Sequence, residues 1–263
     1  MHISGNDVYV TGRIGVIGAG QRATLWVNGN PQTLSNIQSW AGSVYVSGGN
    51  VYVAGWQGAG ANQRATVWVN GAPQTLSNIV SQAHSVYVSE GNVYVAGWTG
   101  QGAGQRAVLW VNGNPQTLAN TASIANFVRV SGGDVYITGR IGPEGANARA
   151  VVWLNGDAHT GTDFQSIANS VYVSGSAVYT VGSGGTGTNM RAALVLVDEV
   201  IGFDLQTLSN TQSNAFCVQI FGSDVYVLGF ESDAGANRAT LWINGEPWTF
   251  GINNSSAFSL VVR

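Results

Sequence analysis

The sequence repeats itself. The block QRATVWVNGAPQTLSN runs from Gln63 to Asn78, with near-copies starting at Gln21 and Gln105. A second marker, VYV-x-G or a variant, starts at Val8, Val51, Val93, Val135, Val178 and Val225, with spacings of 43, 42, 42, 43 and 47 residues. An Arg-Ala pair follows each marker, at Arg22, Arg64, Arg106, Arg149, Arg191 and Arg238. A fixed period of this length indicates six copies of one supersecondary unit.

Each unit has the pattern of four short strands. In the second unit the spacing predicts strands over Ser43–Gly48, Val51–Trp56, Arg64–Gly71 and Ala72–Leu76. Alternating Val, Tyr, Thr and Trp favour strands, and the Gly-Asn and Asn-Gly pairs between them favour hairpin turns. No segment has a helical period. Four antiparallel strands per repeat of 42 to 47 residues predict an all-β fold, a six-bladed β-propeller.

The unit SVYVSGGNVYVAGWQGAGANQRATVWVNG (Ser43 to Gly71) resembles the blade of the NHL family of six-bladed propellers. That pattern has an inner strand, a turn, VYVAD, and an Asn-Arg pair before an apolar strand. All six units keep the Val-Tyr pair and the arginine, but glycine replaces the aspartate at Gly12, Gly55, Gly97, Gly139, Gly182 and Gly229. The resemblance therefore implies the fold of the whole chain and no particular ligand site.

One propeller domain is expected over residues 1–263, with the ring closed by N- and C-terminal strands, because a closed ring leaves only short edges. The inner-strand motif occurs seven times if Met1–Ser4 and Ser259–Arg263 are both counted. We expect the longer C-terminal copy to enter the ring. The surplus copy would fray or dock elsewhere, or it would pair with another molecule. A monomer is expected, with a strand-exchanged oligomer as the alternative.

The composition of the chain excludes several classes of protein. Charged residues make up 9% of the chain, the formal net charge is −3, and no lysine is present. Nucleic acid and membrane insertion are therefore not expected, and the apolar runs are only strand-sized. Cys217 cannot pair within the chain and fits a buried position.

The first residues, MHISGNDVYV, do not have the pattern of a signal peptide. A cytoplasmic protein is thus one alternative; an extracellular or cell-surface protein, whose signal peptide lies outside this sequence, is favoured.

A ligand is expected on the face with longer loops. The connections between second and third strands and between successive units are the longer and more varied ones, and binding residues collect on such loops. Trp56, Trp98 and Phe230 share one position there, and Trp40 and His84 are expected in the loops between units. Together these five residues form a predicted binding rim. Burial of the aromatic rings against neighbouring blades is the alternative.

Two repeated residues have structural explanations. The third-strand tryptophan is expected to fill the space between blades; Val195 replaces it in the fifth unit, and the others are Trp26, Trp68, Trp110, Trp153 and Trp242. The six arginines are expected to form a ring that braces loop carbonyls, with anion binding as the alternative.

The inner strand differs between units at one position, which is Tyr45, Tyr87, Arg129, Tyr172 or Gln219, and His2 in the first unit. A position that accepts all of these residue types does not fit dry core. These residues are expected to line a polar central channel.

Catalysis has little support. The chain has three histidines and neither a G-x-S-x-G nor an H-E-x-x-H motif. Asp157, His159 and Asp163 depart from the repeat, but a solvated strand edge explains them better than a metal site does. No cofactor and no metal are expected. The sequence favours a non-catalytic binding module for a glycan or an extended polypeptide. The alternatives are a protein scaffold without a small ligand, or a hydrolase or lyase at the channel mouth.

Overall fold

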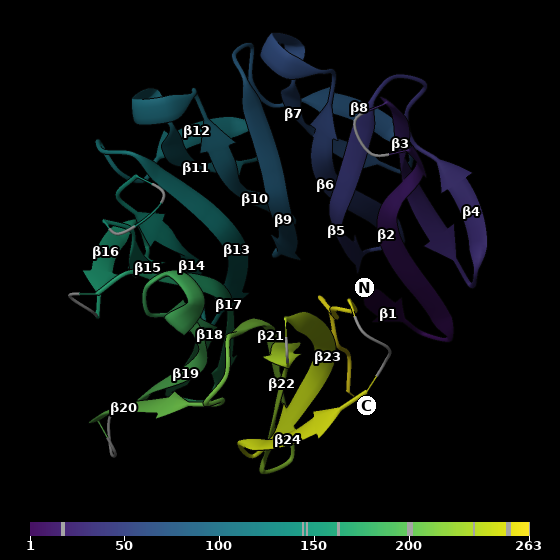
Figure 1. The fold of residues 1–263 in the computed structure, drawn as a ribbon. Helices are drawn as coiled ribbons and strands as arrows, with labels where there is room; N and C mark the ends of the chain where they lie inside the picture. Colours follow the sequence, from purple (N-terminus) through teal and green to yellow (C-terminus); the bar gives the residue numbers. More distant parts are fainter. Residues whose placement is uncertain are drawn as a thin grey trace. The chain divides into compact units, whose positions relative to one another are not determined.

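The computed structural model describes residues 1–16, 19–143, 145, 147–161, 164–198, 202–233, 235–250 and 254–262. Its strands form six four-stranded antiparallel sheets, the blades of a six-bladed β-propeller, which confirms the predicted fold class. Within each blade the strands follow one another in chain order (Figure 1). Among the described residues the only helices are three short 3-10 turns between second and third strands: η1 (Gly60–Asn62), η2 (Gly102–Gly104) and η3 (Gly187–Asn189).

The strand bounds are as follows. Blade 1 has β1 (His2–Ser4), β2 (Asp7–Val16), β3 (Ala19–Val27) and β4 (Asn30–Thr33); blade 2 has β5 (Ser39–Ser47), β6 (Asn50–Gln57), β7 (Arg64–Val69) and β8 (Ala72–Thr75). Blade 3 has β9 (Ser81–Ser89), β10 (Asn92–Thr99), β11 (Arg106–Val111) and β12 (Asn114–Thr117); blade 4 has β13 (Ser123–Ser131), β14 (Asp134–Ile141), β15 (Arg149–Leu154) and β16 (Asp157–Thr160). Blade 5 has β17 (Ser166–Ser174), β18 (Ala177–Gly184), β19 (Arg191–Asp198) and β20 (Gly202–Thr207); blade 6 has β21 (Ser213–Phe221), β22 (Asp224–Asp233), β23 (Ala236–Ile243) and β24 (Glu246–Thr249).

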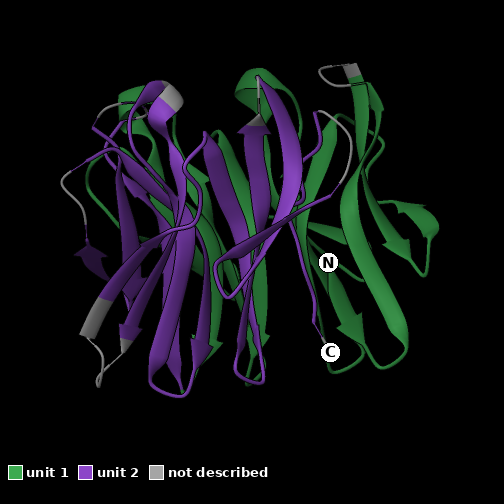
Figure 2. Ribbon diagram, turned by 60° about the horizontal axis from the view of Figure 1, so that its bottom comes forward, with its two compact units in different colours: residues 1–132 green, residues 133–263 purple. Residues whose placement is uncertain are grey.

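The chain divides into two compact units, Met1–Gly132 and Gly133–Arg263 (Figure 2). Unit 1 contains β1 to β13, and unit 2 contains β14 to β24. The expected single domain over residues 1–263 stays a prediction.

Asparagine forms the tight turn between third and fourth strands, as the Asn-Gly pairs predict. Asn70 has a φ of 51°, a left-handed conformation that asparagine tolerates better than most residues. Its Oδ1 accepts a hydrogen bond of 2.9 Å from the backbone N–H of Val51, at the start of the second strand. The same bond, with the same length, links Asn28 to Val8, Asn112 to Val93, Asn155 to Val135 and Asn244 to Val225.

Three of the third-strand tryptophans, Trp68, Trp110 and Trp242, fill the space between blades, as expected. Trp68 is 0% exposed and packs against Ala23, Leu25 and Leu34 of the preceding blade. Trp110 joins blades 2 and 3 in the same way, and Trp242 joins blades 5 and 6. The hydrophobic core of each unit is therefore a series of layers between neighbouring sheets.

A serine marks where the first strands of blades 2 to 6 begin, which in blade 2 is four residues earlier than the sequence pattern predicts. Ser39 Oγ accepts a 2.9 Å hydrogen bond from the N–H of Ala23 in the preceding blade and donates to the Ile37 carbonyl. Equivalent bonds to a backbone N–H are made by Ser81, Ser123, Ser166, Ser213 and Ser255.

The two ends of the chain differ from the first strands of the other blades. β1 takes the first-strand position of blade 1 and pairs with β2, His2 lying opposite Tyr9. Ser255 marks the corresponding position after blade 6, but residues 254–262 contain no assigned strand. Arg263 lies outside the described residues. The expected closure of the ring by both terminal segments stays a prediction.

Candidate binding sites

A β-bulge interrupts the first strand of four blades and re-aims one side chain in each. The pairing of β9 with β10 passes from Ala83 to Ser85 and leaves His84 unpaired in the ladder. The residues at the same position in β5, β17 and β21 are Gly42, Asn169 and Phe216.

The bulge side chains contact the next segment along the unit. His84 Nδ1 lies 3.1 Å from the carbonyl oxygen of Ala125 in β13. In unit 2 the Asn169 side-chain amide donates to the Ala215 carbonyl at 2.8 Å, and the Phe216 ring lies 4.7 Å from that of Phe258. These contacts join neighbouring first strands, so the bulge residues contribute to the packing of blades within each unit.

His84, predicted in a loop of the binding rim, instead lies in strand β9 and is partly buried. Its Nε2 lies 3.2 Å from Gln82 Oε1, and its ring also bonds the Asn126 side chain. Burial lowers the pKa of His84 to about 4, and its hydrogen bonds offset only part of this effect. The folded protein therefore holds a neutral imidazole at pH 7.

His84→Gln is expected to reduce the acid sensitivity of the fold. Between about pH 4 and 6.5 the unfolded chain binds a proton at His84 that the folded chain excludes, so stability falls as the pH falls through this window. The wild type should lose on the order of 2 kcal/mol more than the variant between pH 7 and pH 4.5, as measured by urea unfolding. The control is His159→Gln on the exposed strand β16. An equal pH dependence for wild type and His84→Gln would contradict this account.

Three of the first-strand residues predicted to line a channel, His2, Tyr45 and Tyr87, contact one another in unit 1. The rings of His2 and Tyr45 lie 4.6 Å apart, as do those of Tyr45 and Tyr87. Burial and the hydrogen bond with Tyr87 raise the pKa of Tyr45, while the charge of Arg129 opposes this. Burial, and secondarily the N-terminal charge, lowers the pKa of His2. These first-strand side chains are partly buried, as are Tyr172 and Gln219 in unit 2. Their role as a channel lining stays a prediction.

The other predicted rim residues lie in strands rather than loops. Trp40 is in β5 and pairs with Trp56 of β6, because the serine bond of Ser39 begins the first strand ahead of it. Trp56 and Trp98 are each only 9% exposed. Phe230 lies in β22 and is partly buried. Their part in ligand binding stays a prediction, and the two buried tryptophans offer little surface to a ligand without a local rearrangement.

Five of the repeated arginines donate to backbone carbonyls of residues that precede them in the chain. Arg64 Nη1 donates to Ala61 at 2.8 Å and to Gln63 at 2.9 Å. Arg106 makes the same pair of bonds in blade 3, to Ala103 and Gln105. Arg22, Arg149 and Arg191 each donate to the carbonyl of the residue before them, and Arg238 lies at the same position in β23. Such bonds would brace irregular backbone, and the expected ring of six bracing arginines stays a prediction.

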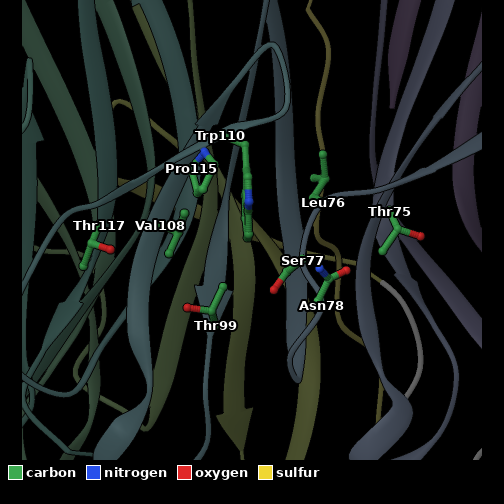
Figure 3. Close-up of a pocket in the computed structure, with 9 residues that line it drawn as sticks. All are labelled: Thr75, Leu76, Ser77, Asn78, Thr99, Val108, Trp110, Pro115 and Thr117. Carbon is green, nitrogen blue, oxygen red and sulfur yellow. The ribbon is translucent and has the colours of Figure 1, made fainter.

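A groove between blades 2 and 3 in unit 1 is a candidate site, with a volume of about 480 Å³ (Figure 3). Val108 and Trp110, both buried, lie beneath its surface. Figure 3 shows Ser77 and Asn78 side by side, with Thr99 nearby. The remaining lining residues are Thr75, Leu76, Pro115 and Thr117. None of the nine has an ionisable side chain, so the groove suits a neutral ligand that forms hydrogen bonds.

Sequence reasoning missed this groove because its residues repeat. Ser77 and Asn78 begin the longer connection between blades 2 and 3, and Thr99 ends β10 where another longer connection starts. The groove thus lies beside the loops on which a ligand was expected. The sequence feature that could have pointed to the groove is the recurring PQTLSN segment. Its hydroxyl and amide groups lie next to those of the following repeat.

The residues of the fourth repeat considered as metal ligands lie on strand β16 or next to it in the sequence. Asp157 and His159 lie on the exposed strand β16, and Asp163 lies outside the described residues. Within the described parts of the chain no group of three or more His, Cys, Asp or Glu side chains gathers in a way that could hold a metal ion. No helix in the same residues has the length and apolar character needed to cross a bilayer.

No protein-family model matches this chain, and no curated protein sequence matches it. Among solved structures the chain is similar to TolB from Acinetobacter baumannii, with a TM-score of 0.56, 8% identity, and coverage of 93% of this chain and 64% of TolB. It is also similar to a puromycin-hydrolyzing peptidase of Mycobacterium tuberculosis, with a TM-score of 0.47, 16% identity, and coverage of 89% of this chain and 40% of the peptidase. A GH43_12 protein retrieved from a capybara gut metagenome has a TM-score of 0.43 and 10% identity, with coverage of 79% of this chain and 51% of that protein. The chain spans less than two thirds of each of these proteins. The likeness to TolB shows the propeller fold alone.

Proposed function

We propose that this chain is a non-catalytic binding module that holds neutral glycans in the grooves between its blades. The observation that supports this most directly is the lining of the groove between blades 2 and 3. Hydroxyl and amide side chains line it together with the apolar Leu76 and Pro115, and none of the lining side chains is ionisable. Ligand sites of this kind combine apolar surface with a few polar groups that fix orientation.

The repeat extends the proposal to further grooves. Between blades 1 and 2 the same positions hold Thr33, Leu34, Ser35, Asn36, Trp68, Pro73 and Thr75, with Gln57 and Thr66 in place of Thr99 and Val108. Several weak and nearly equivalent sites are therefore expected. Such sites give a multivalent ligand an overall affinity well above that of a single site.

Binding to a glycan array, followed by titration of any hit, tests the proposal. Replacing Asn78 and Thr117 together by alanine is expected to weaken binding at this groove about tenfold, through the loss of two hydrogen-bonding groups. Gln74→Ala is the matched control, because Gln74 is exposed on β8 and does not line the groove. A blank array, or a hit whose affinity the double variant leaves unchanged, would exclude this groove as a glycan site.

Three finer proposals accompany this one. The NHL-like origin of the blades is supported by the Val-Tyr pair and the bracing arginine, which all six units keep. A polypeptide ligand, without a glycan, is the second proposal and is taken up below. The third is that residues 1–263 act as one propeller domain.

A further inference from the structure

Blade 5 lacks the side chain that fills the space between blades elsewhere. Val195 of β19 stands where the other five units have tryptophan. Its partner across the ladder is Leu205, whereas Trp68, Trp110 and Trp242 face a proline. Blade 5 thus places a smaller side chain at this position of the layer between blades 4 and 5 than the tryptophan of the other repeats.

The missing ring leaves a cavity in unit 2. Its volume is about 60 Å³, and Ala150, Ile167, Val181, Ala193, Val195 and Leu205 are among its lining residues. The surface that lines it is almost entirely apolar. Because an empty apolar cavity holds no well-bonded water, apolar groups enter it without displacing a favourable contact.

An aromatic ring already covers part of this cavity. Phe164, in the connection from β16 to β17, lines it and lies over Gly184, where an added Cβ would overlap the ring. The corresponding residues between the blades of unit 1 are Ile37 and Ile79, where the tryptophan is present. Phe164 is 47% exposed, so it covers the opening from outside rather than packing as core.

We propose that the gap in blade 5 binds an aromatic side chain of a partner polypeptide, with Phe164 turning outward to admit it. The sister layers, with buried Trp68, Trp110 and Trp242, show that the surrounding framework accepts an indole. The cavity alone is too small for a whole ring, so the ligand needs further contacts outside it. Leu205 (41% exposed) and Val197 (47% exposed), which shares the face of Val195, provide an apolar surface for a chain. This site does not depend on the glycan proposal.

Fluorine NMR titration of the full chain with 5-fluoroindole and with the tripeptide Gly-Trp-Gly tests the site. Saturable binding of both probes is expected, the tripeptide binding at least as tightly as the indole. Phe164→Ala should tighten binding about threefold or more, because the open state no longer competes with a covering ring. Val195→Trp should weaken it about tenfold or more, because the ring supplied from within fills the cavity. The tripeptide is followed by its effect on the bound 5-fluoroindole signal.

Ile37→Ala is the matched control, since it removes the residue that corresponds to Phe164 at a layer already filled by Trp68. It should leave binding unchanged. If Val195→Trp does not fold, Val195→Phe replaces it. Equal binding by Val195→Trp and the wild type would overturn the site. An effect of Ile37→Ala equal to that of Phe164→Ala would also overturn it. So would the absence of binding by both the wild type and Phe164→Ala. Binding of 5-fluoroindole without the tripeptide would overturn the assignment to a polypeptide.

Discussion

Replacing Trp68 by alanine is expected to lower the free energy of unfolding by about 3–5 kcal/mol, the range for large-to-small changes in a packed core. Trp68 is 0% exposed, and its ring packs against side chains of both blades 1 and 2. Its Nε1 has no hydrogen-bond acceptor among the described residues, so the loss comes from packing rather than from a broken polar contact. Urea unfolding, followed by far-UV circular dichroism, measures the change.

The chain contains a matched control for this substitution. Trp248 of β24 is 65% exposed, so Trp248→Ala removes an indole that is largely in water. Its effect is expected within about 0.5 kcal/mol, as for most surface changes. Losses of similar size at the two positions would show that the layers between blades are not the main source of stability.

Replacing Gly97 by alanine is expected to cost about 3 kcal/mol, at the upper end of the range for overpacking. A Cβ at this position would overlap the carbonyl oxygen of Gln82 in β9 and lie 3.0 Å from the Cα of Ala83. Both are backbone atoms held by the bulged first strand, so they cannot move aside as a flexible side chain could. The free energy of unfolding, again measured in urea, reports the cost.

Gly104→Ala, in the same blade, controls for the general effect of removing a glycine. Gly104 has no heavy atom within 4 Å of an added Cβ and no positive φ, so this change should be nearly neutral or slightly stabilising. A nearly neutral Gly97→Ala would show that the bulge relaxes readily, contrary to the rigid contact inferred here.

The close contact at Gly97 recurs in other repeats and explains a departure from the NHL-like pattern. The units have glycine where that pattern has aspartate, and at Gly55, Gly97, Gly182 and Gly229 an added Cβ would overlap a carbonyl of the first strand. The bulge at Gly42, His84, Asn169 or Phe216 brings that carbonyl close. The sequence displays the glycines, but the reason for them is a contact between two strands.

The candidate sites were less predictable than the fold. The sequence placed Trp40 and His84 in loops, whereas the serine bond at the start of each first strand draws them into the ladder. Conversely, the sequence pattern does not single out Ser77, Asn78 or Thr99, because they are ordinary residues of the repeat. In the structure, Ser77 and Asn78 of the second repeat share a groove with Thr99 of the third repeat. Repetition identifies equivalent positions, and it does not say which of them meet at a surface.

The sequence alone determined the architecture, because six copies of a four-strand pattern with Asn-Gly turns leave a β-propeller as the arrangement that matches their length and period. It also identified the third-strand tryptophans as filling between blades, since a large apolar residue that recurs with the repeat must be buried by the neighbouring repeat. Only the tertiary structure decided which side chains the bulges re-aim, and where the hydroxyl groups of two neighbouring repeats gather. It also decided that Val195 leaves a cavity. These depend on distances between atoms of different blades, which no local pattern records.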